Sequence, residues 1–189
     1  MLKSPAFLIW LLNGFGLSLS PATAQESKGT LIAEGQYFSV YADPPVDAYS
    51  VSSKLNYEYL VFGHGLAKGA SGGQEQILSR SIDGLYQEVS DVTGIHVYSF
   101  KGIIRVLPDK QSLANMLKQE YNLDFNERSL YYFEKNTIYI SQEDMTLGML
   151  GHEMTHAIIS NYFVVPPPQK VQEILSDYVE YALNKTHGS

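Results

Sequence analysis

The chain has 189 residues, of which 44% are hydrophobic and 17% are charged, a composition typical of a globular protein and not of a disordered one. The net charge is −7 and there is no run of Lys or Arg, so nucleic acid and anionic membranes are poor partners. Because the chain has no cysteine, disulfides and thiolate metal sites are excluded, and any metal must be held by His, Asp or Glu.

The first 24 residues have the pattern of a secretory signal peptide. Lys3 precedes an apolar run over residues 6–19, which is followed by an A-x-A cleavage pattern at residues 22–24. The run is too short and too rich in Gly and Ser for a membrane span, although an uncleaved N-terminal anchor is the alternative. We therefore expect an exported protein, periplasmic or extracellular, with one domain over residues 25–189 and no membrane contact after cleavage.

The next part of the chain predicts a strand, a loop and a helix. Alternating side chains over residues 37–41 predict a strand that stops at the two prolines that follow. The β-forming residues around 60–62 are ambiguous and run into a Gly- and Ser-rich loop at residues 63–73. Apolar residues then recur at near-helical spacing over residues 74–93, which predicts a helix that is ended by Gly94.

The second half predicts a β-rich segment and three helices. Residues 95–109 predict a hairpin or two short strands, and residues 129–141 predict a hairpin around residues 134–136. Amphipathic or apolar patterns predict the helices 109–122, 144–162 and 169–184, and three prolines separate the last two. The order of elements indicates an α+β fold with a small mixed sheet.

The predicted helix 144–162 carries two histidines four positions apart, His152 and His156, with Glu153 directly after the first. Residues four apart on a helix point the same way, so both imidazoles can reach one ion while Glu153 lies beside it. Zinc hydrolysis needs two neutral nitrogen ligands and a carboxylate that takes a proton from the activated water. The alternative is a solvated helix face that happens to carry two histidines.

The last predicted helix carries Glu173 and Asp177, again four positions apart. A carboxylate from a second, antiparallel helix would complete a three-ligand site and leave a fourth position for water. Asp177, one turn beyond Glu173, is placed to accept a hydrogen bond from the far nitrogen of a ligating imidazole. The alternative for both acids is again a solvated helix face.

These two segments together resemble the gluzincin metallopeptidases, in which an H-E-x-x-H helix is followed by a glutamate-bearing helix. HEMTH at residues 152–156 matches the first motif residue for residue, and EILSD at residues 173–177 resembles the E-x-x-x-D segment of thermolysin-like members. Residues 95–184 also resemble the small bacterial proteins called peptidase-MA-like. The resemblance implies a zincin-like fold, in which a small mixed sheet packs on the active-site helix and the glutamate-bearing helix.

Carried over to this chain, the resemblance implies Zn²⁺ as the cofactor, with His152, His156 and Glu173 as its ligands. Glu153 is then the general base, and Asp177 is the partner of a ligating histidine. The implied activity is hydrolysis of a peptide or protein substrate that lies against an edge strand in the region 130–141. The alternative is a non-catalytic or latent binding protein or scaffold with a structural metal site, which would have no need of the base.

Two positions depart from the gluzincin pattern. Gln172 precedes the glutamate and Ile174 follows it, where members of the family often have Asn before or Gly after. Metzincins are excluded, because their pattern needs Gly at position 159 and His at position 162, where this chain has Ile159 and Tyr162.

Single histidines in apolar or Gly-rich surroundings are seldom ligands, so we do not expect His64 or His96 to bind the metal. The candidates for stabilising an oxyanion are Tyr162, Tyr178, Tyr181 and His187.

Overall fold

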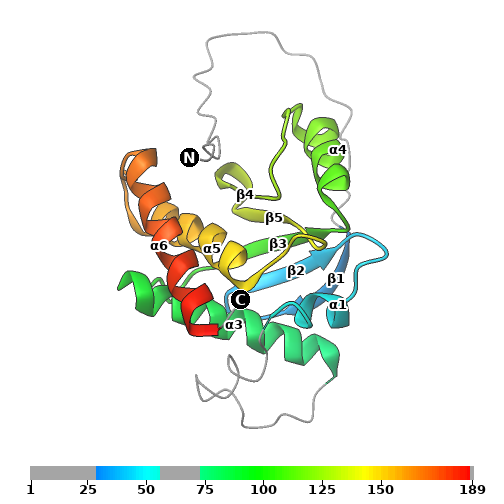
Figure 1. Cartoon of the computed structure of the whole chain (residues 1–189), viewed down its shortest axis with the longest axis horizontal. Helices are drawn as coiled ribbons and strands as arrows, with labels where there is room; N and C mark the ends of the chain where they lie inside the picture. The colour runs from blue at the N-terminus through cyan, green and yellow to red at the C-terminus, as the bar shows by residue number, and fades with distance from the viewer. Residues whose placement is uncertain (1–28, 56–72, 188–189) are drawn as a thin grey trace.

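The computed structural model describes residues 29–55 and 73–187, which form a five-stranded sheet with helices on both faces (Figure 1). The strand order is β1-β2-β3-β5-β4; the three inner strands are parallel, and each edge strand is antiparallel to its neighbour. The α+β class and the mixed sheet are therefore confirmed. The strands are β1 (Thr30–Glu34), β2 (Phe38–Ala42), β3 (Gly102–Leu107), β4 (Ser129–Tyr132) and β5 (Thr137–Ser141).

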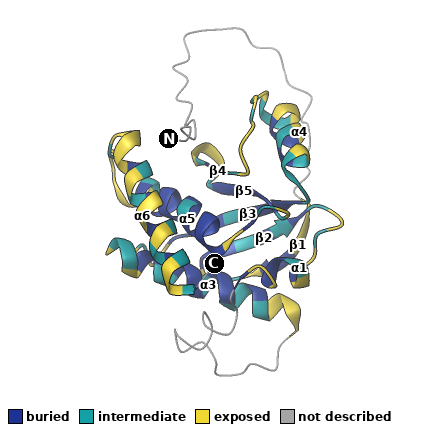
Figure 2. Ribbon diagram, in the orientation of Figure 1, coloured by how far each residue is buried: buried dark blue, intermediate teal, exposed yellow. Residues whose placement is uncertain are grey.

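The described helices divide unequally between the two faces of the sheet. Helices α3 and α5 cover one face of the sheet and form the main core with it, and α6 packs on the outside of these two helices. Helix α4 covers part of the other face, where a smaller apolar cluster includes Leu113 and Leu117. Figure 2 shows the strands and α5 mostly buried, while the outer side of α6 is exposed. The helices are α1 (Ala48–Ser52), α3 (Gln74–Thr93), α4 (Lys110–Tyr121), α5 (Leu147–Tyr162) and α6 (Gln169–His187), with a 3-10 turn η1 (Phe133–Lys135).

Several predicted elements are confirmed because local chemistry sets their ends. Helix α3 stops where Gly94 adopts a left-handed conformation with φ of 68°, which glycine reaches without strain. Helix α4 begins where the Asp109 carboxylate accepts a hydrogen bond from the Ser112 N–H, and it ends at Asn122, also left-handed. The predicted hairpin is the antiparallel pair β4–β5.

The prediction of two strands over residues 95–109 is wrong, since only Gly102–Leu107 is a strand. The backbone before it is used otherwise: the Ile95 N–H caps α3 by donating to the Ser90 carbonyl, and the Val97 carbonyl accepts from the Tyr86 hydroxyl at 2.9 Å. These bonds leave this segment wrapped around the end of α3. The sequence patterns also missed β1 and the short helix α1.

The predicted boundaries of the last two helices need small corrections. Helix α5 begins at Leu147 and not at Asp144, because Thr146 caps it by accepting a hydrogen bond from the Met149 N–H at 3.1 Å. Asp144 instead accepts from the Ser141 hydroxyl. Helix α6 continues to His187, three residues beyond the predicted end.

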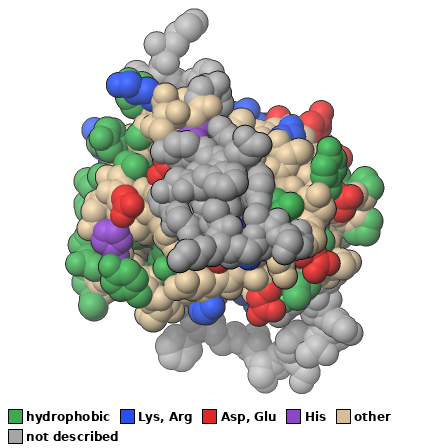
Figure 3. All heavy atoms as spheres, turned by 90° about the horizontal axis from the view of Figure 1, so that it is seen from below, with side chains coloured by type: hydrophobic (Ala, Val, Ile, Leu, Met, Phe, Trp, Pro, Cys, Tyr) green, Lys and Arg blue, Asp and Glu red, His purple; other side chains and the backbone are tan. Residues whose placement is uncertain are grey.

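Four predictions fall on residues outside the described ranges: the signal peptide 1–24, the ambiguous β-forming residues around 60–62, residues 63–72 of the Gly- and Ser-rich loop, and His64. Among the described helices, none combines the length and the apolar character that crossing a bilayer requires. The Lys and Arg side chains that are visible in Figure 3, outside the grey atoms, are scattered.

Candidate metal centre

Two histidines of α5 face α6 from successive helical turns. The Nε2 atoms of His152 and His156 lie 3.3 Å apart, and the ring centroids are 5.1 Å apart. Most of α5 is buried, including His156. A largely apolar helix therefore carries these polar rings inward, which argues against the alternative of a solvated face.

Glu173 of α6 faces both histidines, with one carboxylate oxygen toward each ring. Its Oε2 lies 3.6 Å from Nε2 of His152, and its Oε1 lies 3.7 Å from Nε2 of His156. Ligand atoms placed roughly 2.0–2.2 Å from one tetrahedral zinc are about 3.3–3.6 Å apart. The side chains that were predicted to be ligands thus converge, since one ligand atom from each lies within 4.8 Å of the others, and a donor set of two imidazoles and a carboxylate suits zinc.

The triple-proline turn fixes where α6 begins. The Val171 and Gln172 N–H groups both donate to the Pro168 carbonyl, and the Gln172 side chain donates to the Pro167 carbonyl at 2.9 Å. Gln172 is buried, so its departure from the gluzincin pattern has a structural role. Ile174, the other departure, is exposed and does not crowd the histidines.

Two glycines of α5 allow α6 to come close. A Cβ on Gly148 would lie 2.3 Å from the Asn184 Oδ1, and a Cβ on Gly151 would lie 2.1 Å from the Leu183 Cδ1. Because Gly148 and Gly151 meet the end of α6 while His156 meets Glu173 near its start, the two helices run antiparallel. The predicted antiparallel arrangement is therefore present, and it depends on small residues that the sequence analysis did not single out.

On its other side, His152 faces two more carboxylates. Its Nδ1 lies 3.4 Å from the Glu180 Oε2 and 3.5 Å from the Asp177 Oδ1. The predicted position of Asp177 beside a candidate ligand is thus observed, but Glu180 was missed. The spacing of Glu173, Asp177 and Glu180 by four and three residues places them along one helix stripe, and this signal was available in the sequence.

The acidic surroundings change the protonation of His152. Burial lowers the pKa of its imidazole, but the carboxylates of Glu173 and Glu180 outweigh burial and raise the pKa to about 10. For Glu173, burial raises the carboxyl pKa, but His152 and His156 outweigh it and lower the pKa below its usual value. The acidic neighbours therefore favour the protonated imidazole of His152, whereas a metal binds the neutral one, so we expect metal binding at these side chains to release a proton.

Glu153, the predicted base, is buried beside the edge strand β4. Its Oε1 accepts a hydrogen bond from the Ser129 hydroxyl at 2.7 Å, and its Oε2 accepts one from the Tyr131 N–H at 2.7 Å. Glu153 does not belong to the described groups of converging ligand atoms, in keeping with a role beside the metal and not on it. Because Tyr131 donates to Glu153, this N–H is not free to pair with a peptide added at the edge of the sheet.

The candidates for stabilising an oxyanion have other surroundings in the structure. Tyr162, Tyr178 and Tyr181 are each more than half exposed. The His187 Nε2 lies 3.0 Å from a carboxylate oxygen of Glu88 on α3. The three tyrosines are thus turned largely to solvent and His187 faces Glu88, so none of these four side chains receives support as an oxyanion donor.

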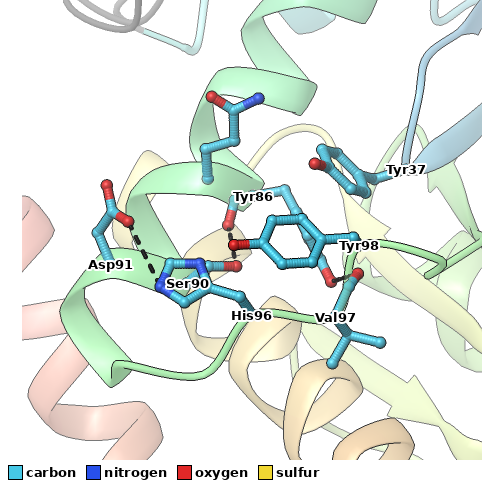
Figure 4. A pocket seen from close by; sticks show the side chains of 8 residues that line it. Tyr37, Tyr86, Ser90, Asp91, His96, Val97 and Tyr98 are labelled. Atoms are coloured by element: carbon cyan, nitrogen blue, oxygen red, sulfur yellow. Dashed lines mark hydrogen bonds and ion pairs between the residues drawn. The ribbon is translucent and has the colours of Figure 1, made fainter.

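His96 lies in a separate pocket at the end of α3. Figure 4 shows it beside Asp91, at 3.8 Å, with Tyr37, Tyr86 and Tyr98 around the same hollow. The ring of His96 stacks on Tyr98 with centroids 5.9 Å apart. Among the described residues His96 belongs to no group of converging ligand atoms.

No family model, curated protein or solved structure matches the chain. The resemblance to gluzincins therefore rests on the H-E-x-x-H sequence and on the side chains described above. Peptidase activity and zinc binding are inferences from that geometry.

Proposed function

We propose that the chain is an exported zinc-dependent peptidase. The observation that carries this proposal is the convergence of His152, His156 and Glu173. The two Nε2 atoms lie 3.3 Å apart, and each lies 3.6 or 3.7 Å from a different carboxylate oxygen of Glu173. A solvated pair of histidines would have no reason to converge with a carboxylate from another helix. A zincin-like arrangement, in which the H-E-x-x-H helix lies between an edge strand and a glutamate-bearing helix, is part of the same proposal.

Each side chain then has a distinct task. His152, His156 and Glu173 hold the metal, and Glu180 and Asp177 orient His152 through its Nδ1. When bound, zinc supplies a Lewis acid that polarises a peptide carbonyl and lowers the pKa of a water molecule. Glu153 accepts a proton on its carboxylate and returns it to the leaving amine.

The second candidate function is a binding or scaffold protein with a structural metal. The hydrogen bonds from β4 give the Glu153 carboxylate a structural use, and this observation favours the second candidate. The two functions differ in whether Glu153 is required for chemistry, because a structural site needs only its ligands.

Metal analysis and a Glu153→Gln variant test the proposal together. We expect about one zinc per chain in both proteins, and hydrolysis of a broad peptide library by the wild type alone, with a loss on the order of a hundredfold or more in the variant. Glu143→Gln, the same change at an exposed site, is the matched control and should keep full activity. A wild type that holds zinc and cleaves nothing would support the scaffold instead.

Export is the remaining part of the proposal. The A-x-A pattern at residues 22–24 predicts that the exported protein begins at Gln25. An intact mass that still includes residues 1–24 would favour the uncleaved anchor.

A further inference from the structure

The buried carboxylate of Glu153 is satisfied by β4 and not by a basic side chain. Glu153 is only 5% exposed, yet among the described residues no Lys or Arg forms an ion pair with it. Its two partners are the hydroxyl of Ser129 and the N–H of Tyr131, each at 2.7 Å. Short bonds from neutral donors stabilise a buried carboxylate without cancelling its charge.

The two bonds fix the orientation of the carboxylate as well as its position. The donors lie two residues apart on one strand, and each takes a different oxygen of Glu153. A glutamate side chain held at a single oxygen can still rotate about its terminal bonds, whereas one held at both oxygens cannot. Each oxygen keeps a second lone pair, so the carboxylate is immobilised but can still accept a proton.

We propose that Ser129 is a positioning residue for Glu153, and this inference rests on the proposed peptidase function. The side chain of Ser129 donates its hydroxyl to Glu153, so it would act through the carboxylate that it holds. The Tyr131 N–H belongs to the backbone, so Ser129 is the only side chain that supplies one of these two bonds. A displacement of about 1 Å of a catalytic group can cost on the order of a hundredfold in rate.

A purely structural role for Ser129 is the competing explanation. In that case the hydroxyl merely satisfies a buried acid, and its loss lowers the stability of the fold without a specific effect on turnover. If Ser129 positions Glu153, its loss lowers kcat while zinc content and KM stay constant. If its role is purely structural, kcat of the folded, zinc-loaded protein does not change.

The kinetic test compares three variants of the full zinc-loaded protein. We expect Ser129→Ala to lower kcat by roughly ten- to a hundredfold while KM and zinc content stay unchanged, because substrate and metal are held by other groups. Ser129→Thr keeps the hydroxyl and should restore most of the rate. Ser141→Ala removes a hydroxyl from the neighbouring strand, where it donates to Asp144, and should leave kcat unchanged.

A second measurement does not depend on activity. In the metal-free protein, the Tyr131 amide donates to Glu153 and should be protected from hydrogen exchange. If Ser129 holds the carboxylate in place, Ser129→Ala should speed the exchange of this amide by about tenfold or more relative to its neighbours in β4, and Ser129→Thr should not.

The outcomes separate the inference from the function on which it rests. If the wild type holds zinc and hydrolyses nothing, the proposed function fails, and the positioning role fails with it. If the wild type is active and Ser129→Ala is equally active, or loses activity together with zinc, the positioning role alone is overturned. An active wild type in which Ser129→Ala shows unchanged Tyr131 exchange would also overturn it.

Discussion

His152 Nδ1 lies 3.4 Å from Glu180 Oε2, while Nε2 of the same ring faces Glu173 at 3.6 Å. One imidazole thus joins the candidate metal centre to a carboxylate two helical turns further along α6. A carboxylate that accepts a hydrogen bond from a ligating imidazole fixes which nitrogen carries the proton and increases the basicity of the other nitrogen, and Glu180 is placed to do this if His152 binds a metal.

Replacing Glu180 should weaken zinc binding without abolishing it. We expect Glu180→Ala to raise the dissociation constant for zinc by about ten- to a hundredfold, the usual effect of losing such a partner. Asp177→Ala should have a smaller effect, because the Asp177 side chain is 72% exposed against 40% for Glu180. Competition with a chelator of known affinity measures both, with Glu75→Ala as an exposed control. A larger effect at Asp177 would restore it as the principal partner of His152.

Glu173 and Glu153 should differ in what their loss removes. Glu173→Ala takes away one of three converging donor atoms, so we expect zinc to be lost together with hydrolysis. Glu153→Gln leaves the ligands untouched and should keep zinc while losing hydrolysis. Zinc content per chain and peptide cleavage are measured on both variants. Stoichiometric zinc in Glu173→Ala would place the third ligand elsewhere.

The approach of α6 to α5 should depend on Gly151. A methyl group there would meet Leu183, which is fully buried, so α6 must move or Leu183 must repack. We expect Gly151→Ala to lower the free energy of unfolding by about 1–3 kcal/mol and to weaken zinc binding. Urea unfolding and zinc titration measure the two effects. Gly73→Ala is the control for zinc binding, since a Cβ at Gly73 meets nothing within 4 Å; as the N-cap of α3 it should cost about 1 kcal/mol or less of stability and leave zinc affinity unchanged. Equal zinc affinity of the two variants would show that Leu183 moves aside freely.

A buried ion pair on the opposite face of the sheet should contribute more to stability than an exposed one. Arg105 on β3 is buried and bonds Glu120 at 2.9 Å and Asp43 at 3.1 Å. Glu120→Gln leaves this guanidinium with one carboxylate, so we expect a loss of about 1–3 kcal/mol in the free energy of unfolding. Asp124→Asn breaks the exposed pair with Lys118 and should cost about 1 kcal/mol or less. Urea unfolding compares them, and equal losses would contradict the role of burial.

The sequence by itself determined the elements whose ends are set by local chemistry. Gly94 ends α3 because glycine takes the left-handed conformation, and Asp109 begins α4 because its carboxylate caps the next N–H groups. The same local rule placed His152 and His156 together, since residues four apart on any helix share a face.

Segments whose structure depends on distant partners were predicted less well. Residues 95–101 contain β-forming side chains, but bonds to α3 and to the Tyr86 hydroxyl hold them outside the sheet. Strand β1 carries little pattern of its own and exists because β2 pairs with it. β-forming tendency follows the available neighbours more than the backbone, so short strands are decided by packing.

In the candidate site, too, the sequence predicted some features and the packing of the elements decided others. The sequence indicated Glu173 and Asp177, but only the packing of α5 against α6 at Gly148 and Gly151 brings Glu173 within 4 Å of both histidines. Ser129 lies 24 residues before Glu153 and reaches it only because β4 occupies the edge of the sheet next to α5. Spacing along one helix fixes which side chains share a face, whereas contacts between elements depend on how closely those elements pack, and no local pattern specifies that distance.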